Sequence, residues 1–364
     1  MPTQNGNVQI VAGRNERNEH VFSVLVKRSY RIANGQVAAR ADTDAPFRLI
    51  DEYYDNGDPD WSTVKHEGEL SPYKAVTDVV VIGTAHAPNG KPTDRMTVSV
   101  EVGERKKELV VTGDRRCHHR PQMAPVFSEV LPFVEMEIRY DYAYGGHDER
   151  SDPTIPFHYP RNFMGKGVVL RNVREVVEGL PLPNIEAPND LLTPERVIIE
   201  DPAKWHLQPL PQGFGWRQRT WYPRNTLLGG YPPFLTVGTV TAEERMGLLQ
   251  RNHIAFAKQS RLAPREAAFN NGASLGLLFG TLPADERIRL CGLTPEGAFE
   301  FSLPGDTPII ALDLGESMQS LSPRLHIVSI RPDDLAMDIV WRGALIYPGP
   351  AWLPKMERLE AEVL

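Results

Sequence analysis

Short runs of alternating apolar residues, each ended by glycine or proline, constrain the fold of this chain more than any other feature. Successive side chains of a strand point to opposite faces, so alternation predicts strands with one buried face. The sequence has 29 glycines and 32 prolines in 364 residues, about one residue in six against about one in eight in average proteins. We expect a mainly β protein with antiparallel sheets, sandwich-like or barrel-like, with long irregular loops and a few short helices.

The first section of the chain, residues 1–120, is predicted to be a β meander. Its strand-like runs are residues 20–32, 77–87, 96–102 and 107–112. Asn34-Gly35 suits a tight hairpin after the first run, because both central positions of such a turn need a positive φ. Residues 79–82 are apolar on both faces, which predicts a strand at the centre of a sheet.

Three further sections follow the meander. Residues 121–240 are rich in proline, glycine and aromatic residues, and this composition predicts irregular coil packed on the sheet. Short helices are expected in residues 241–275, where Thr241 and Glu244 form a capping box. Residues 276–364 return to strands, with a turn at Pro332 and a final helix over residues 355–364. Together the sections predict one compact, two-lobed unit.

Charge and cysteine content limit the partners of the chain. The net charge of −7 argues against general binding to nucleic acid or to anionic membranes. No apolar run approaches the length of a membrane span, and the N-terminus lacks the pattern of a signal peptide. Cys117 and Cys291 are the two cysteines, which is too few for a disulfide framework. These features predict a cytoplasmic protein with no nucleic-acid and no membrane partner.

The sequence contains no convincing catalytic set, metal site or cofactor motif. Ser71 and Lys74 match the S-x-x-K pattern, but the S-D-N and K-T-G elements that accompany it are missing. Cys117-His118-His119 is the densest group of metal-binding residue types, yet adjacent residues of an extended segment point to opposite sides. We therefore predict no enzyme activity, no cofactor and no metal. A metal-dependent hydrolase that uses Cys117, His118 or His119 with distant acids is the alternative.

The loops are unusually aromatic, and this suggests binding to another protein. Most of these rings are expected to fill a core, but tryptophan and arginine are also enriched where proteins bind each other. Trp216, Trp221 and Arg224 are therefore candidate partner-binding residues.

An ordered series of motifs spans residues 20–347. The motifs include Leu70-Ser-Pro-Tyr-Lys74, Thr77-Asp-Val-Val-Val-Ile-Gly83, Val110-Val-Thr-Gly-Asp-Arg115, Tyr142-Ala-Tyr-Gly-Gly146, Arg161-Asn-Phe-Met-Gly-Lys-Gly167, Pro211-Gln-Gly-Phe-Gly215 and Trp221-Tyr-Pro-Arg224. The series resembles a bacterial family of unknown-function domains encoded beside type VI secretion spikes and toxins. Members of that family are described as effector adaptors or chaperones.

The resemblance implies a non-enzymatic adaptor that binds a toxin effector protein and helps load it onto the spike-tip protein. A structural component of the spike or baseplate is a further alternative. If the family motifs contact the partner directly, the first candidates are Lys74, Asp78, Asp114 and Arg115. The competing interpretation is that these charges pair with each other or with backbone groups and fix the geometry of the loops.

Overall fold

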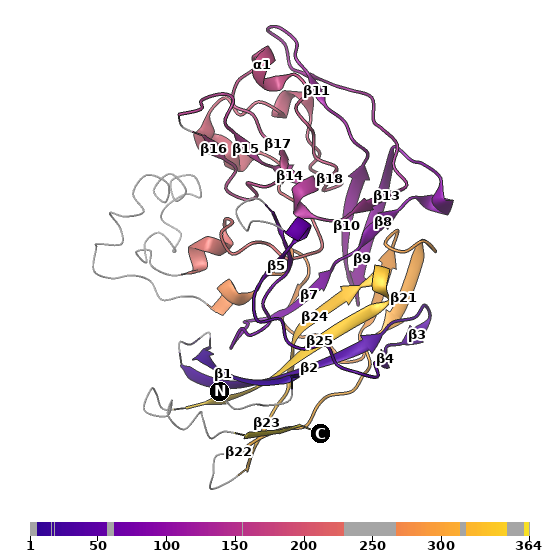
Figure 1. Cartoon of the computed structure of the whole chain (residues 1–364), viewed down its shortest axis with the longest axis vertical. Helices are drawn as coiled ribbons and strands as arrows, with labels where there is room; N and C mark the ends of the chain where they lie inside the picture. Colours follow the sequence, from indigo (N-terminus) through magenta and orange to yellow (C-terminus); the bar gives the residue numbers. More distant parts are fainter. Residues whose placement is uncertain are drawn as a thin grey trace, which may run out of the picture.

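The computed structural model describes residues 6–15, 17, 19–56, 62–154, 156–228, 267–313, 318–347 and 360–363. Two large β-sheets form the body of the molecule, and a smaller lobe of short strands and coil stands at one end of them (Figure 1). The prediction of a mainly β protein is confirmed. Among the described residues no helix is both long and apolar enough to cross a membrane.

The first sheet has seven strands, drawn from the N-terminal and C-terminal parts of the chain. Its spatial order is β1 (Val8–Arg14), β2 (His20–Arg31), β25 (Ala336–Ile346), β24 (Arg324–Arg331), β7 (Thr77–Val81) and β19 (Leu278–Phe279), with β4 (Ala39–Arg40) paired to the end of β2. Neighbours run antiparallel except β24 and β7, which are parallel. The turn between β24 and β25 is the short helix η8 (Pro332–Asp334), where the sequence predicts it.

The second sheet has six strands and is also mixed. Its order is β18 (Ile185–Glu186), β10 (Arg105–Thr112), β9 (Arg95–Val102), β20 (Arg287–Cys291), β21 (Ala298–Ser302) and β3 (Gln36–Val37). The β21–β3 pair is parallel and the others are antiparallel. Gly103 has a φ of 57° at the turn between β9 and β10, a conformation that glycine adopts without strain.

A shared hydrophobic core holds the two sheets together as a sandwich. Phe22, Val24 and Val26 of β2 alternate into the same cluster as Val98 and Val100 of β9. Neither sheet closes on itself in the part of the chain that the structure describes. The sandwich-like alternative is therefore the observed one, and the barrel-like alternative is not.

The first sheet is buried on its second face as well, and this second face positions the candidate site. Val79 and Val81 of β7 point into the sandwich core, whereas Val80 joins a separate cluster with Trp216 and Ala273. All three valines are almost fully buried, as expected for a central strand apolar on both faces. Irregular loops therefore cover this face of the sheet.

The smaller lobe has its own core, formed by residues such as Tyr144, Tyr159 and Trp205. Its secondary structure consists of short pieces because proline and glycine interrupt the segment. They are β11 (Cys117–His118), β12 (Val126–Phe127), β14 (Tyr144–Gly145), β15 (His147–Asp148), β16 (Phe157–His158), β17 (Lys166–Gly167), α1 (Arg174–Val177), η4 (Pro194–Arg196) and η5 (Pro202–Leu207).

The remaining elements are also short. They are β5 (Glu52–Tyr53), η1 (Tyr54–Asn56), β6 (Val64–His66), β8 (Thr84–His86), η2 (Pro88–Gly90), β13 (Glu135–Glu137), η3 (Tyr140–Tyr142), η6 (Arg224–Leu228), η7 (Ala267–Asn270), β22 (Ile310–Asp313), β23 (Met318–Leu321) and β26 (Glu360–Val363). The helix predicted from Thr241 lies outside the described residues. The helix predicted over residues 355–364 is wrong for its last part, because β26 pairs there with β22.

Candidate functional site

A surface cleft opens between the loops around β5 and β6, on the covered face of the first sheet. Its volume is 530 Å³. Leu49 and Ile50 line it and are 67% and 76% exposed. The full lining, which we call the Ile50 cleft, consists of Leu49, Ile50, Asp51, Tyr53, Glu67, Gly68, Leu70, Ser71, Pro72, Lys74, Arg219 and Asn270.

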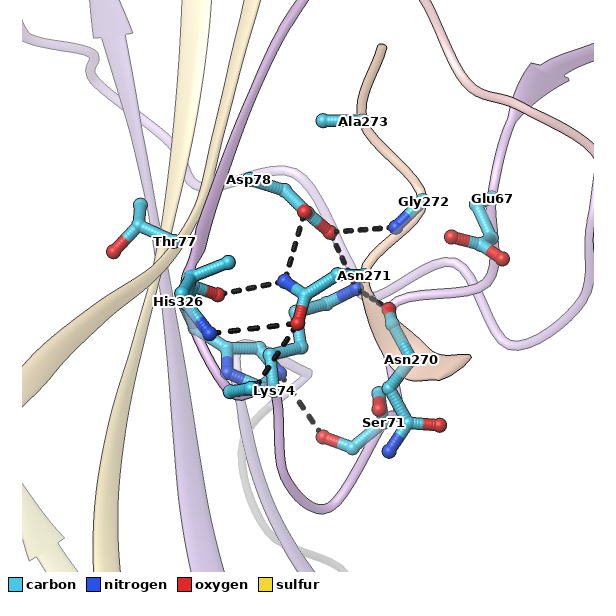
Figure 2. Close-up of polar contacts among 12 residues, drawn as sticks. Glu67, Ser71, Lys74, Thr77, Asp78, Asn270, Asn271, Gly272, Ala273 and His326 are labelled. Atoms are coloured by element: carbon cyan, nitrogen blue, oxygen red, sulfur yellow. Dashed lines mark hydrogen bonds and ion pairs between the residues drawn. The ribbon is translucent and has the colours of Figure 1, made fainter. Parts of the chain in front are cut away.

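The floor of the Ile50 cleft contains a buried ion pair, shown in Figure 2. Lys74 Nζ lies 2.7 Å from Asp78 Oδ2, and both residues are buried. Lys74 also donates a hydrogen bond to the Asn270 carbonyl oxygen, and its Nζ lies 5.5 Å from the centroid of the Trp216 ring. Because an unpaired charge is costly to bury, these contacts fix the position of the ammonium group.

Asn271 and Gly272 complete this arrangement by tying the loop after η7 to the segment that enters β7. Asn271 Nδ2 donates to Asp78 Oδ1 at 2.9 Å and to the Val76 carbonyl at 2.7 Å. The Gly272 N–H donates to Asp78 Oδ2 at 3.2 Å. Both carboxylate oxygens of Asp78 are therefore occupied. We call Lys74, Asp78, Asn271 and Gly272 the Lys74 network.

A second ion-pair group, the Glu67 network, lies on the other side of Gly272. Glu67 Oε1 accepts from Arg224 Nη2 at 2.6 Å and lies 2.8 Å from Arg219 Nε. A Cβ atom on Gly272 would lie 2.3 Å from Glu67 Oε2 and 2.8 Å from both Arg224 Nη1 and Trp216 Cε3. The absence of a side chain at Gly272 is what lets the two networks pack together.

A third buried network supports the loop that carries Leu49 and Ile50. Lys27 Nζ lies 2.7 Å from Glu69 Oε2, and Arg48 Nη1 lies 3.1 Å from Glu69 Oε1. The Arg48 N–H also donates to Glu69 Oε2 at 2.9 Å. Because Arg48 directly precedes Leu49, this network fixes the backbone at the mouth of the cleft. The exposed apolar side chains thus stand on a rigid base.

Five of the seven side chains predicted for partner contact are buried in the structure. Lys74, Asp78, Trp216 and Arg224 come together beneath the Ile50 cleft. Trp221 lies instead in the sandwich core, with its ring centroid 5.2 Å from that of Tyr140. These five side chains shape the surface through the residues they support.

Asp114 and Arg115, the other two predicted residues, lie beside β18 and not at the cleft. Arg115 forms an ion pair with the buried carboxylate of Glu186. Asp114 Oδ1 accepts a hydrogen bond from Asn184 Nδ2 at 3.0 Å. Their contacts are those of turn charges that fix loop geometry, which is the competing interpretation of these residues.

Sequence reasoning missed Leu49, Ile50, Glu67 and Asn271. The apolar pair Leu49-Ile50 lies between the charged residues Arg48 and Asp51, and this was the signal that the sequence offered. Glu67 gave none, because its partner Arg224 is 157 residues away along the chain. Asn271 also gave no signal in the sequence, because its partner Asp78 is 193 residues away along the chain.

The two residues of the S-x-x-K pattern, Ser71 and Lys74, form hydrogen bonds within the loops around them. Lys74 bonds Asp78 and Asn270, while the Ser71 hydroxyl donates to the Tyr73 carbonyl at 3.4 Å. The S-x-x-K pair therefore does not form a nucleophile and base in this structure.

The Cys117 and His118 side chains are also held apart. Cys117 is buried in the core of the smaller lobe, and burial raises the pKa of its thiol to about 12. His118 Nδ1 lies 3.0 Å from Glu178 Oε1 at the surface, and Glu178 Oε2 accepts from the His119 N–H at 2.9 Å. Within the described ranges no three His, Cys, Asp or Glu side chains gather in a way that could hold a metal ion.

Two buried histidines make the stability of the fold sensitive to acid. Burial lowers the pKa of His66 to about 3, and burial together with the Lys74 charge lowers the pKa of His326 well below its ordinary value. Below pH ~6.5 the unfolded chain binds protons at these rings while the folded chain does not. Stability is therefore greatest above pH ~6.5 and falls with decreasing pH, by up to about 1.4 kcal/mol per pH unit for each histidine.

Substitution of His326 tests this pH dependence. His326 Nε2 donates to the Ser71 carbonyl at 3.0 Å, and His326→Gln keeps a donor without a titrating ring. We expect urea unfolding of the variant to depend less on pH between 6.5 and 4.5 than unfolding of the wild type. His119→Gln serves as the control, because no ion pair joins the His119 side chain to any described residue, and it should keep the wild-type slope. Equal slopes for all three proteins would show that His326 does not contribute to the pH dependence of stability.

The fold and the site together define a β-sandwich protein whose open surface cleft lies over buried ion pairs. A family model described as "Uncharacterized protein conserved in bacteria (DUF2169)" matches residues 17–342. The chain belongs to this family, because the match covers most of its length. No curated protein and no solved structure matches the chain.

Proposed function

We propose that this chain is a cytoplasmic, non-enzymatic adaptor or chaperone that binds a toxin effector protein and helps load it onto the spike-tip protein of a bacterial type VI secretion system. The motif series described above supports the secretion context. The observation that carries the binding role is the pair Leu49 and Ile50, exposed at the mouth of a 530 Å³ cleft.

The cleft has the composition expected of a reversible docking site. Apolar side chains at its mouth supply the hydrophobic contact that a partner buries, and Asp51 and Arg219 place polar groups beside them. Interfaces that form and separate combine a modest apolar centre with a polar rim. The cleft fits one anchor segment of a partner, and a standard interface of about 1,600 Å² in total would extend over the neighbouring loops.

The buried networks beneath the cleft explain how a surface built from loops can bind specifically. Loops cost conformational entropy to order upon binding, and preorganisation removes that cost. The Lys74 and Glu67 networks, together with the Lys27–Glu69 pair, tie the loops of the cleft to β2 and β7 of the first sheet. The cleft therefore presents a fixed shape to its partner.

The contacts of the candidate metal ligands favour a binding protein over the metal-dependent hydrolase alternative. That alternative uses Cys117, His118 or His119 with distant acids. Cys117 faces a hydrophobic core, while His118 and the His119 N–H contact Glu178 at the surface.

Co-purification tests the proposal. The chain is co-expressed with the toxin encoded beside its gene, and the complex is measured by affinity capture and size-exclusion chromatography. Wild type should elute with the toxin. Leu49→Asp/Ile50→Asp should weaken binding at least about tenfold, because charge at the apolar centre of an interface is strongly unfavourable.

The control for this experiment is Ile309→Asp, a similar change at a residue that is 61% exposed and does not line the cleft. It should bind the toxin like wild type, with all variants checked by circular dichroism. Unchanged binding of the double variant would contradict the role of the cleft. Stable assembly of the wild type with spike proteins but with no toxin would favour the structural-component alternative.

A further inference from the structure

A second groove lies on the smaller lobe and shares no residue with the Ile50 cleft. Its volume is 700 Å³. Met123 and Leu207 line it and are 54% and 61% exposed, and Ile198 adds a half-buried apolar side chain. We call it the Leu207 groove; its lining is completed by Gln122, Ala124, Pro125, Asn172, Pro194, Glu195, Ile199, Glu200, Asp201, Lys204 and Gln208.

The charge of the Leu207 groove is predominantly negative. Three carboxylates, on Glu195, Glu200 and Asp201, line it and are exposed, against one ammonium on Lys204. None of these carboxylates forms an ion pair with any described residue. Glu195 and Glu200 are therefore available to a partner, unlike the carboxylates beneath the Ile50 cleft, while Asp201 caps η5.

The walls of the groove are held by contacts behind it. Asn172 Nδ2 donates to the Met123 carbonyl at 2.9 Å and fixes the loop on one side. On the other side, Asp201 Oδ1 accepts from the Ala203 N–H at 3.0 Å at the start of η5. Ile199 of the same wall is buried in the core of the smaller lobe. The groove is a part of the folded lobe and needs no rearrangement to accept a ligand.

We propose that the Leu207 groove binds a cationic amphipathic segment of a partner protein. Apolar side chains of that segment pack between Met123 and Leu207, and its lysine or arginine side chains pair with Glu195 and Glu200. Charge complementarity selects this partner, because an acidic segment would be repelled by the same carboxylates. The inference goes beyond the proposed function, since it assigns a second docking surface that is separate from the first.

Binding of a labelled peptide tests the proposed specificity of the Leu207 groove. The probe is a short amphipathic peptide of lysine and leucine, and its binding to the full chain is followed by fluorescence anisotropy at physiological salt. A glutamate–leucine peptide of the same pattern and an all-lysine peptide are the comparison probes. We expect the lysine–leucine peptide to bind at least about tenfold more tightly than either, because both charge and apolar contact are required.

Matched variants locate the binding. Glu195→Gln/Glu200→Gln and, separately, Leu207→Ser should each weaken binding of the lysine–leucine peptide at least about fivefold. Glu104→Gln/Glu296→Gln makes the same change in net charge at exposed residues outside the groove and should have no effect. Equal binding by all variants, tight binding of the all-lysine peptide, or no binding of the lysine–leucine peptide would each overturn the proposal. Binding of toxin to the Ile50 cleft is unaffected by any of these outcomes.

Discussion

Replacing Asp78 with alanine is expected to lower the free energy of unfolding by about 3–5 kcal/mol, because the substitution leaves the buried ammonium of Lys74 without its carboxylate. Asp78 is fully buried and also accepts hydrogen bonds from Asn271 and Gly272. Those donors lose their partner in the variant. Urea unfolding followed by circular dichroism gives the change.

A double-mutant cycle separates the ion pair from the rest of the effect. Lys74→Met removes the positive charge, so Lys74→Met/Asp78→Ala has no unpaired charge to bury. The double variant should be destabilised by clearly less than the sum of the two single variants. Additive effects would mean that the pair contributes nothing to the stability of the cleft floor.

Replacing Gly272 with alanine is expected to destabilise the fold by about 3 kcal/mol and to weaken toxin binding in parallel. The added Cβ would lie 2.3 Å from Glu67 Oε2 and 2.8 Å from Trp216 Cε3, so at least one network must move. Overpacking of a filled site costs about 1–3 kcal/mol, and the disturbed ion pairs add to it. Thermal unfolding and the co-purification assay measure the two effects.

Gly215→Ala is the matched control for this prediction. A Cβ atom there would meet no atom within 4 Å, so the substitution should change stability by no more than about 0.5 kcal/mol. If Gly272→Ala were as mild as Gly215→Ala, the close packing of the two networks would not be needed for the fold.

Local patterns in the sequence were enough to predict most of the sheet strands. β7 was predicted because Val79–Val81 is apolar on both faces. β24 and β25 were predicted because a proline turn separates two strand-like segments with apolar centres. The hairpin signal at Asn34-Gly35 was correct in that β4 returns to pair with β2. The tight turn was wrong, because Arg31 pairs with Ala39 across seven residues and Gly35, but not Asn34, has a positive φ. These signals depend on neighbours within a few residues.

The candidate site could not be predicted in the same way, because it is built from contacts between distant segments. Lys74 and Asp78 are four residues apart, yet their burial depends on a loop almost 200 residues further along. Their charge left two interpretations open, partner contact or pairing within the fold, and the structure shows Lys74 paired with Asp78. The side chains exposed at the cleft are Leu49 and Ile50, and this pair matches no sequence motif for catalysis or binding.

Site-specific photocrosslinking tests the central claim most directly. Ile50→benzoylphenylalanine places a photoreactive group at the mouth of the cleft, and irradiation of cells co-expressing the neighbouring toxin traps whatever protein lies within contact distance. The account predicts a covalent adduct between this chain and the toxin from position 50, and none from the same replacement at Ile309. Equal yields from the two positions, or an adduct from Ile309 alone, would contradict it.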